Sequence, residues 1–594
     1  MQAIILAAGY GRRMRPLTDS EHKALLRIGG QAIIDRMVNG LVANGITKII
    51  VATGYLARRL ESHLKSTHPM VEFRFVENPS YDTTNNIHSL ARVLKEVEID
   101  EDVLLIESDL IYEPSVITRI IKSSAENVAL VAKHRRGLDG TVVTVSNGVI
   151  TSIIPPHLQD ADFNFTDKYK TLNIYKFSAE FCNHSLERLL DYYTSVFDHN
   201  AYYELVLGML IYIQKATIRA EIIDGEKWAE VDDPNDLDVA NFIFNDGPAR
   251  YAALEAASGG YWNFDVLDFS FIRNMHFPTA AVLSELKTGL GTLLTQYGSR
   301  QSVLDQKLAY FLLCRPENVC LLNGCSQVYP MLERYFAGRQ VLVPAPTFGE
   351  YERAFPRARS YPDRVGLDSR EIEGHAREAD VVVFVNPNNP TGSLLPSEWI
   401  YDYADRNPSK AVIVDESFID FAEVPSLLGL LEQKPLDNVI VLKSLSKPLG
   451  IPGLRLGFAY SSNPAFNEFV RQGLPIWNCN SLAEHFLELI LKHREALARS
   501  FAATAADREQ LAAQLAEVPG IETVYPSAAN FILVRLDERS RGRKSLATAL
   551  LAHSSIYVKD VSRKFADGRA YARLAVRLPD ENAALVGALR ATLP

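Results

Sequence analysis

Cysteine is scarce in this chain of 594 residues, which contains five of them. They stand at positions 182, 314, 320, 325 and 479, and no two form a CxxC pair. An odd number of cysteines without close pairs argues against a disulfide framework and against a zinc site. We therefore expect reduced thiols in a cytoplasmic protein.

Long hydrophobic runs are also missing. The longest apolar stretch, "LVLGMLIYI", is too short to span a bilayer. We expect no signal peptide ahead of the first strand, which is predicted to start near Gln2. The sequence thus predicts a protein with no membrane partner.

The chain has no excess of positive charge and no histidine cluster. Its formal net charge is −10, which argues against a nucleic-acid partner. The 13 histidines are scattered without the spacing of metal ligands. Internal repeats and low-complexity tracts are absent from the sequence as well.

The composition and length indicate more than one globular domain. Hydrophobic residues make up 47% of the chain and charged residues 23%, as in proteins with full cores. Over residues 1–244, strand-like runs such as "AIILAAG" and "DVLLIESD" alternate with helical patterns, and a second such pattern fills residues 259–594. We predict two α/β domains with mostly parallel sheets, joined by a linker at 245–258, where glycine, alanine and small polar residues break the rhythm.

Four kinds of reactive group follow strand-like runs in the second half. "NGCSQ" opens a helix after a strand and suits a phosphate, Asp415 ends the run "AVIVD", and Lys447 and Arg455 follow "NVIVL". Parallel strands bring such groups to one sheet edge. A lysine amine, a buried carboxylate and an anion cradle are the groups that pyridoxal phosphate requires. The alternative for Lys447 is a solvated surface lysine.

From about residue 260 to 594 the chain resembles the fold-type I aminotransferase superfamily, nearest to histidinol-phosphate aminotransferase and threonine-phosphate decarboxylase. The stretches "NPNNPTG", "VDESFIDF" and "SLSKPLGIPGLRLG" carry the resemblance. It implies that Lys447 bonds the cofactor aldehyde and that Asp415 holds the pyridinium nitrogen.

The same resemblance implies roles for further residues. Asn389 would bond the ring hydroxyl and Phe348 would stack on the ring. The cofactor phosphate would be held by Gly324, Cys325, Ser326, Ser444, Ser446 and Arg455. Arg573, with Asn274 as an alternative, would take the substrate carboxylate, although Arg573 also fits an ordinary surface arginine. Tyr297 would reach the phosphate site of a neighbouring subunit, which predicts a homodimer.

One position departs from the aminotransferase pattern. Phe418 stands three residues after Asp415, where aminotransferases of this type usually carry a tyrosine that bonds the ring oxygen. The stretch "DESFIDF" resembles the decarboxylases more, so we favour decarboxylation and leave transamination open.

The first half begins with a strand and a glycine-rich turn with three arginines, "LAAGYGRRMRPLT". Gly9 and Gly11 would let the backbone approach a polyphosphate, and Arg13 would meet the leaving pyrophosphate. Asp109, Glu230 and Asp232 would together hold Mg²⁺, although "EVDDPNDLD" alone also fits a solvated helix start.

Over about 240 residues this half resembles the sugar-phosphate nucleotidyltransferases with a Rossmann-like fold, and among them the phosphocholine cytidylyltransferases. The resemblance implies that CTP binds at Leu6, Ala7, Ala8, Gly9, Gly11, Arg13 and Lys23, with Arg13 and Lys23 catalytic and Asn85 and Asn86 near the acceptor. His22 replaces the proline that the family carries before the lysine. Tyr175, Tyr203, Glu204 and Trp228 fit either contact with an amine on the acceptor or ordinary core packing.

Two chemistries on one chain suggest one metabolite. Aminophosphonates offer an oxyanion to CTP and an amino group to pyridoxal phosphate, and the architecture resembles the fusion enzymes of phosphonate biosynthesis. We predict cytidylyl transfer onto an aminophosphonate and decarboxylation of an amino acid phosphonate such as 2-amino-4-phosphonobutyrate or its CMP ester. The alternatives are a transaminase that makes 2-aminoethylphosphonate from phosphonoacetaldehyde, a phosphocholine-type cytidylyltransferase, or one half that is a non-catalytic regulatory or dimerisation module.

Overall fold

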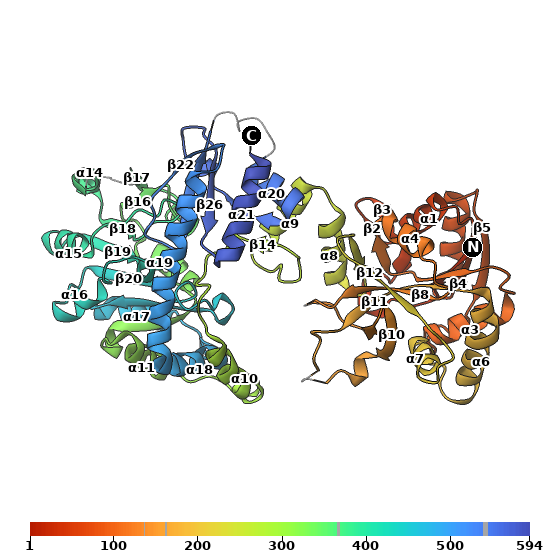
Figure 1. The fold of residues 1–594 in the computed structure, drawn as a ribbon. Helices are drawn as coiled ribbons and strands as arrows, with labels where there is room; N and C mark the ends of the chain where they lie inside the picture. Colours follow the sequence, from red (N-terminus) through yellow and green to blue (C-terminus); the bar gives the residue numbers. More distant parts are fainter. Residues whose placement is uncertain (136, 161–162, 365–368, 538–544, 594) are drawn as a thin grey trace. The chain divides into compact units, whose positions relative to one another are not determined.

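The computed structural model describes residues 1–135, 137–160, 163–364, 369–537 and 545–593. The chain divides into two compact units, unit 1 over Met1–Phe264 and unit 2 over Asp265–Pro594. Figure 1 shows unit 1 in red to yellow and unit 2 in green to blue. The division lies beyond the 245–258 segment suggested as a linker, and helix α9 (Gly247–Ala257) occupies most of that segment.

Unit 1 is built on a mixed sheet in the order β5-β4-β1-β6-β11-β8-β12-β10-β9. Its strands are β1 Gln2–Ala7, β2 Arg27–Ile28, β3 Gln31–Ala32, β4 Lys48–Thr53, β5 Glu72–Glu77, β6 Val103–Glu107, β7 Leu110–Tyr112, β8 Val128–Lys133, β9 Val142–Ser146, β10 Val149–Ile154, β11 Tyr169–Phe177, β12 Arg219–Ile223 and β13 Trp228–Glu230. Its helices are α1 Ile33–Ala43, α2 Ala57–Thr67, α3 Asn86–Glu96, α4 Pro114–Lys122, α5 Ala179–Phe181, α6 Glu187–Val196, α7 Glu204–Tyr212, α8 Pro234–Phe244 and α9.

Strands β5, β4, β1 and β6 run parallel, as predicted, and β11 lies antiparallel between β6 and β8. Both faces of the central strands are covered. Along β1, Ile4 and Leu6 pack into one apolar cluster, whereas Ala3, Ile5 and Ala7 pack into another on the opposite face. Burial on both faces explains why the parallel strands read as unbroken apolar runs in the sequence.

Unit 2 contains a larger sheet in the order β15-β21-β20-β19-β18-β16-β17 and a smaller antiparallel sheet, β22-β23-β26-β25. Its strands are β14 Leu267–Asp268, β15 Val319–Asn323, β16 Val341–Ala345, β17 Arg359–Pro362, β18 Val381–Val385, β19 Ala411–Asp415, β20 Val439–Ser444, β21 Leu456–Ser461, β22 Ile521–Val524, β23 Phe531–Leu536, β24 Ile556–Tyr557, β25 Lys559–Asp560 and β26 Tyr571–Ala575. Its helices are α10 Ala280–Thr295, α11 Gln301–Leu312, α12 Tyr329–Tyr335, α13 Gly349–Ala354, α14 Ser369–His375, α15 Ser397–Arg406, α16 Leu428–Gln433, α17 Pro464–Gln472, α18 Ser481–Ile490, α19 Arg494–Ala516, α20 Leu546–Ser554 and α21 Pro579–Thr592.

The parallel strands β16, β18, β19 and β20 of the larger sheet end at one edge, where their carboxyl ends carry the motifs. Apolar clusters again cover both faces: Val382 and Phe384 of β18 belong to one cluster, and Val381 and Val383 belong to the other. Two packed faces fix the strands, so the loops that follow them project from a rigid edge. The α/β class predicted for both halves is confirmed.

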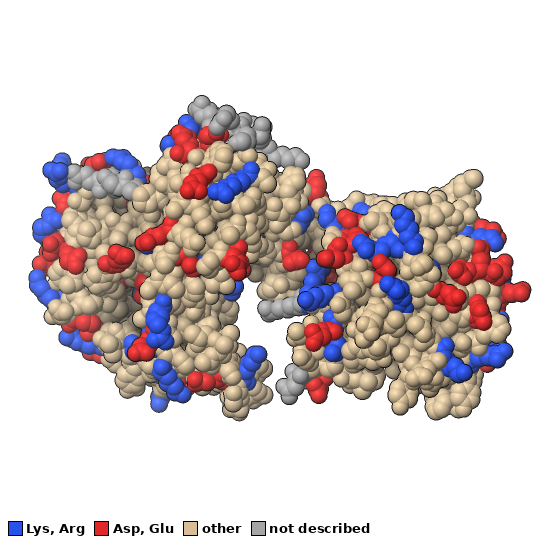
Figure 2. Space-filling model, in the orientation of Figure 1, with Lys and Arg blue, Asp and Glu red and all other residues tan. Residues whose placement is uncertain are grey.

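No helix among the described residues is both long and apolar enough to cross a membrane. On the face drawn in Figure 2, acidic and basic side chains are interspersed among neutral ones over both units.

Candidate active sites

A lysine between two aspartates forms the centre of the candidate site in unit 1. The Nζ of Lys23 donates to Oδ2 of Asp109 at 2.9 Å and to Oδ1 of Asp232 at 2.7 Å. Arg13 donates to the other oxygen of Asp232 at 2.7 Å. Burial works to lower the pKa of Lys23, but the two aspartates outweigh it and raise the pKa above its ordinary value. The structure thus joins four residues that lie up to 219 positions apart in the sequence.

The glycine-rich turn after β1 leads into this centre. Leu6 and Ala7 end β1, and Ala8 follows them as a buried residue. Gly11 has a φ of 64°, a left-handed conformation that favours glycine, and it begins the short 3-10 helix that carries Arg13. An added Cβ on Gly9 would meet open space, so the turn is exposed at this point. The backbone at Gly9 is therefore open to solvent, whereas Gly11 packs against Thr18.

His22 anchors the turn that presents Lys23. Its Nε2 lies 3.0 Å from the carbonyl oxygen of Ala7, and its Nδ1 accepts from the N–H of Ala24 at 3.1 Å. Since Nδ1 accepts, Nε2 must donate, and the ring is neutral. Burial lowers the pKa of His22 to about 4, in agreement with a neutral ring. The histidine that replaces the family's proline therefore ties the lysine turn to the end of β1.

The predicted trio of magnesium ligands does not gather around one point. Glu230 binds Lys170 at 3.0 Å and accepts from Asn173 at 3.3 Å, while Asp109 and Asp232 share Lys23. Among the described residues, no group of three or more His, Cys, Asp or Glu side chains is placed to hold a metal ion. Asp109 and Asp232 remain a pair of oxygen donors, and Oδ1 of Asp109 is buried without a partner in the described chain.

Asn85 and Asn86, which were predicted to lie near the acceptor, make different contacts. Asn85 is the N-cap of α3, and its side chain accepts from the N–H of Asn86 at 2.9 Å. Asn86 donates to Oε1 of Glu107 at 3.1 Å and accepts from the N–H of Tyr203 at 3.1 Å. Asn86 therefore connects the end of β6 to the start of α7, beside the centre at Asp109.

Asp415 and Lys447 form the centre of the candidate site in unit 2. Asp415 ends β19 and is 4% exposed; it accepts from the hydroxyl of Tyr351 at 2.8 Å and from the hydroxyl of Ser417 at 2.6 Å. Burial, together with the positive charges of Arg573 and Arg455, lowers the pKa of Lys447 to about 8, while Asp415 opposes the shift. The other lysine of this stretch, Lys443, is bound to Asp420 at 2.8 Å. Lys447 is thus the amine that is available for reaction.

The residues predicted to hold the cofactor phosphate lie on two loops that come close together. Arg455 donates to the hydroxyl of Ser326 at 3.2 Å, and an added Cβ on Gly324 would collide with the Arg455 guanidinium. Gly457 comes equally close to Cys325, since a Cβ there would lie 2.5 Å from its backbone nitrogen. The remaining predicted residues are placed on the neighbouring turn: Ser444 ends β20 and donates its N–H to Ser417, and Ser446 is buried.

A contact between Arg573 and Asn389 joins the smaller sheet of unit 2 to the loop after β18 of the larger sheet. Arg573 lies on β26 of the smaller sheet and donates to Oδ1 of Asn389 at 2.8 Å and to the carbonyl of Ser270. Burial lowers the pKa of Arg573 to about 10. Its Nε is buried and has no partner among the described residues. A buried arginine bonded in this way is not an ordinary surface arginine, so the surface alternative does not hold.

The three aromatic residues singled out in the sequence of unit 2 differ in exposure and in their contacts. Phe348 is 40% exposed at the start of α13, so its ring is free to contact a ligand. Tyr297 is 79% exposed and stacks on Trp477, with ring centroids 4.5 Å apart. Phe418 packs edge-on against Phe531 at 5.2 Å inside an apolar cluster, so this position supplies no hydroxyl.

Asn274 was predicted as an alternative substrate contact, and its geometry points to another task. Its side chain donates to the carbonyl of Pro448 at 2.9 Å and to Ser500 at 2.7 Å, and accepts from the N–H of His276 at 3.0 Å. Its backbone N–H binds the carbonyl of Lys447 at 2.9 Å. Because each of these groups is already bonded and the residue is 1% exposed, Asn274 holds the lysine turn in place.

Sequence reasoning did not find Tyr351, Ser417, Glu107 or Lys170. Tyr351 and Ser417 lie within motifs that were recognised, three residues after Phe348 and two after Asp415. For Lys170 a signal was present: it is a charged residue inside β11, a strand that is otherwise buried along nearly its whole length. Polar residues within such a strand indicate a site or an internal ion pair.

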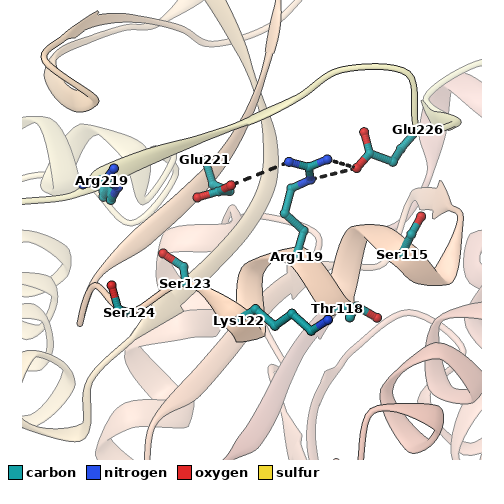
Figure 3. Close-up of a pocket in the computed structure, with 9 residues that line it drawn as sticks. All are labelled: Ser115, Thr118, Arg119, Lys122, Ser123, Ser124, Arg219, Glu221 and Glu226. Carbon is teal, nitrogen blue, oxygen red and sulfur yellow. Dashed lines mark hydrogen bonds and ion pairs between the residues drawn. The ribbon is translucent and has the colours of Figure 1, made fainter.

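A surface pocket along α4 and β12 belongs to neither centre (Figure 3). One of its three cations, Arg119, is bound by Glu226 and lies 3.8 Å from Glu221. Both glutamates that line this pocket are therefore paired with Arg119.

Two family descriptions match the chain. Residues 3–163 match the MobA-like NTP transferase domain, and residues 263–587 match aminotransferase class I and II. Over 603 aligned residues the chain is 31% identical to CMP-5'-(3-aminopropyl)phosphonate synthase of Streptomyces rubellomurinus, covering 99% of this chain and 94% of that protein.

Relatives that correspond to unit 2 alone include decarboxylases. L-serine phosphate decarboxylase of Sulfurospirillum multivorans is 32% identical over 319 residues, which cover 51% of this chain and 80% of that protein. A solved structure of a decarboxylase from the same organism is 26% identical with a TM-score of 0.51, covering 57% of this chain and 91% of that one.

Proposed function

Since the chain belongs to the class I and II aminotransferase family over residues 263–587 and carries a MobA-like NTP transferase domain before it, we propose that it is a bifunctional enzyme of phosphonate biosynthesis. Unit 1 transfers a cytidylyl group from CTP to a phosphonate, and unit 2 decarboxylates an amino acid phosphonate with pyridoxal phosphate. The observation that carries this proposal is similarity over 99% of the chain to a CMP-5'-(3-aminopropyl)phosphonate synthase.

In unit 1 the phosphonate oxygen attacks the α-phosphorus of CTP. A new phosphorus–oxygen bond forms, and the bond to the bridging oxygen breaks and releases pyrophosphate. Lys23 and Arg13 supply positive charge on the two sides of this centre, and the exposed turn at Gly9 and Gly11 offers backbone N–H groups to the phosphates.

Asp109 and Asp232 fit a magnesium ion, which usually takes one or two carboxylates and completes its shell with phosphate oxygens and water. The buried, unpartnered Oδ1 of Asp109 supports this assignment. Bound there, Mg²⁺ would neutralise phosphate charge. Glu230 is assigned instead to Lys170.

The residues of unit 2 fit pyridoxal phosphate. When bound, the cofactor supplies an electron sink for the bond that breaks next to the amino group. Lys447 offers an amine that is half neutral near pH 8, and Asp415 offers a buried carboxylate for the ring nitrogen. Arg455 and Ser326 surround the position for its phosphate.

Decarboxylation accounts for the atoms of the proposed product. Loss of CO₂ from 2-amino-4-phosphonobutyrate, or from its CMP ester, leaves the 3-aminopropylphosphonate group named in the relative. Phe418 supports this choice, because a phenyl ring gives no hydrogen bond to the ring oxygen. The carboxylate leaves as CO₂, and a proton takes its place on the carbon.

Transamination is the second candidate, and Arg573 is the observation that favours it. An arginine bonded to Asn389 is placed to bind a carboxylate that stays on the substrate. In that case the amino group would move to a keto acid, without loss of CO₂.

We also propose a homodimer formed by unit 2. Exposed apolar side chains gather on and near α10, at Leu283, Leu290, Leu294, Tyr297, Ile476 and Trp477. Such a patch supports burial against a second copy, with Tyr297 turned toward the partner's cofactor phosphate.

The reaction is tested by incubating the protein with CTP, Mg²⁺, pyridoxal phosphate and 2-amino-4-phosphonobutyrate. We expect pyrophosphate, CO₂ and a CMP ester of 3-aminopropylphosphonate, identified by mass spectrometry, with no keto acid required. Amino transfer to a keto acid without CO₂ would support the transaminase, and the absence of a CMP ester with every phosphonate tried would contradict the first half.

A further inference from the structure

Three glutamates from separate elements converge beside the lysine centre of unit 1. Glu107 ends β6, Glu204 begins α7 and Glu230 ends β13. Asn86 donates to Glu107 and accepts from the N–H of Tyr203, the residue before Glu204, and this contact brings Glu107 close to Glu204. Burial and the charges of Glu204, Asp109 and Glu230 also raise the pKa of Glu107. We call Glu107, Glu204 and Glu230, together with Tyr175 and Tyr203, the glutamate pocket.

The register of the sheet explains this convergence. Tyr175 of β11 lies opposite Leu105 of β6, and Ile174 lies opposite Ile106. Side chains opposite one another in an antiparallel pair share a face, as do residues two apart on a strand. Glu107 and Tyr175 therefore point to the same side of the sheet. Asn86 donates to Glu107 and accepts from the N–H of Tyr203, so it connects these two residues.

The pocket becomes more deeply buried away from the lysine centre. Glu107 and Glu230 are half-buried, whereas Glu204, Tyr175 and Tyr203 are 4%, 1% and 0% exposed. The two tyrosine rings meet edge to face with centroids 5.9 Å apart. The half-buried carboxylates thus lie next to the lysine centre, and the tyrosines and Glu204 lie deeper in the protein.

The deeply buried end of this group carries polar atoms without a well-formed hydrogen bond. Oε2 of Glu204 and the hydroxyls of Tyr175 and Tyr203 are buried, and none makes a hydrogen bond of good geometry among the described residues, although the hydroxyl of Tyr203 lies close to Glu107 and to Tyr175. A buried polar group without a full partner is costly, and more so if it is charged. Three such atoms in one place therefore indicate a missing ligand.

The missing ligand should be a cation. Lys170 is the one cation bonded to these glutamates in the described part of the chain, and it binds Glu230 alone. Buried carboxylates require positive partners or hydrogen-bond donors. The atoms left over are carboxylate and hydroxyl oxygens, which suit a group with several N–H donors.

We propose that the glutamate pocket binds the primary ammonium group of the phosphonate that accepts the cytidylyl group. This inference rests on the proposed function of unit 1. Glu107 and Glu230 each lie two residues before an aspartate of the lysine centre, so the pocket opens directly beside the position for the reacting oxygen. One short molecule then spans both places, with its phosphonate at Asp109 and Asp232 and its ammonium at Glu204.

This assignment distinguishes between classes of acceptor. A primary ammonium has three N–H donors for Glu107, Glu204 and the tyrosine hydroxyls. A trimethylated nitrogen has no such donor, and an alkylphosphonate without nitrogen would leave the carboxylates unpaired. Unit 1 should therefore select short aminophosphonates over both.

The test measures initial rates of pyrophosphate release by the full-length holoenzyme with CTP and Mg²⁺. Two matched pairs of acceptors are compared: 3-aminopropylphosphonate with propylphosphonate, and 2-amino-4-phosphonobutyrate with 4-phosphonobutyrate. We expect a KM at least tenfold lower for an amine-bearing acceptor than for its matched partner. Glu204→Gln, which removes the charge at nearly constant size, should raise the KM for that amine-bearing acceptor at least tenfold.

Two controls separate binding from folding. Tyr203→Phe removes one hydroxyl and should raise the KM for the amine-bearing acceptor severalfold, while the exposed Glu180→Gln should leave it unchanged. The KM values for CTP and for the acceptors without nitrogen should change less than threefold in Glu204→Gln. Melting temperatures establish that each variant is folded.

The outcomes distinguish this inference from the proposed function. Equal KM values for the members of each pair in the wild type, or an equal rise for both members in Glu204→Gln, would overturn the ammonium pocket and leave cytidylyl transfer intact. A preference for a trimethylammonium phosphonate would also overturn it. Absence of pyrophosphate with any aminophosphonate would overturn both.

Discussion

Lys447 is distinguished from an ordinary lysine by its surroundings. An unperturbed lysine has a pKa of about 10.4. Here burial and two arginines lower the pKa of Lys447 to about 8, so that far more of the amine is neutral near neutral pH than in an ordinary lysine. Lys443, four residues earlier, is paired with Asp420 and has no comparable role.

The rate of covalent uptake of pyridoxal phosphate by the cofactor-free protein should therefore rise with pH and level off above a midpoint near 8. The sign follows from the chemistry, because only the deprotonated amine attacks the aldehyde. The measurement is the growth of the cofactor's visible absorbance between pH 6.5 and 10. Arg573→Gln removes one nearby positive charge and should move the midpoint upward, and Lys447→Ala should show no such absorbance. A wild-type midpoint near 10 would contradict this account.

The turn after β20 is positioned by a segment from the start of unit 2. Asn274 binds the backbone at Lys447 and Pro448, and the chain at Phe277 passes close to Gly450. Gly450 has a φ of 64°, and an added Cβ would collide with the carbonyl of Phe277. The position of the reactive lysine thus depends on a backbone contact between stretches more than 170 residues apart.

Gly450→Ala should displace this turn and destabilise unit 2 by on the order of 2 kcal/mol or more, because both the φ and the contact exclude a methyl group. Gly453→Ala is the matched control, since a Cβ there meets nothing within 4 Å. Its effect should stay within about 0.5 kcal/mol. Thermal melting and the affinity for pyridoxal phosphate are the readouts. Equal effects of the two substitutions would remove the argument for a close-packed turn.

The strands could be predicted from the sequence, whereas their neighbours in space could not. Runs such as "VVVFV" are apolar throughout because β18 packs against clusters on both faces, and this pattern is visible in one dimension. The antiparallel insertion of β11 between β6 and β8 depends on pairing over long sequence distances. The contacts among Glu107, Asn86 and Tyr203 follow from that pairing, so a single sequence gave no access to them.

The division of the chain after Phe264 gives each unit its own sheet and its own apolar clusters. The described contacts at the lysine centre of unit 1 join residues of unit 1, and those at Lys447 join residues of unit 2. Several of the motif residues follow strands closely, such as Asp109 after β6 and Asp232 after β13, while Asp415 ends β19, and such positions can be recognised in the sequence. The segment suggested as a linker was harder to interpret, since its alanines and glycines also permit a helix.

Substitutions in one centre should accordingly leave the other chemistry unchanged. Asp232→Asn removes a charge that binds both Lys23 and Arg13, and pyrophosphate release should fall at least a hundredfold while cofactor absorbance is retained. Lys447→Ala should show the reverse, with no cofactor absorbance and normal pyrophosphate release. Both activities are measured on the same preparations. Loss of both in either variant would contradict independent centres.

Tyr297 has a consequence for how the two activities respond to dilution. The ring is 79% exposed and stacks on Trp477 at the surface, while the proposed dimer turns it toward a second copy. The activity of unit 2 would then depend on protein concentration through the dimer equilibrium, whereas the activity of unit 1 would not. As copies separate at low concentration, unit 2 would lose a component of its cofactor site. Unit 1 would keep every residue of its cytidylyl-transfer site. The ratio of CO₂ to pyrophosphate produced per chain would therefore serve as a gauge of assembly.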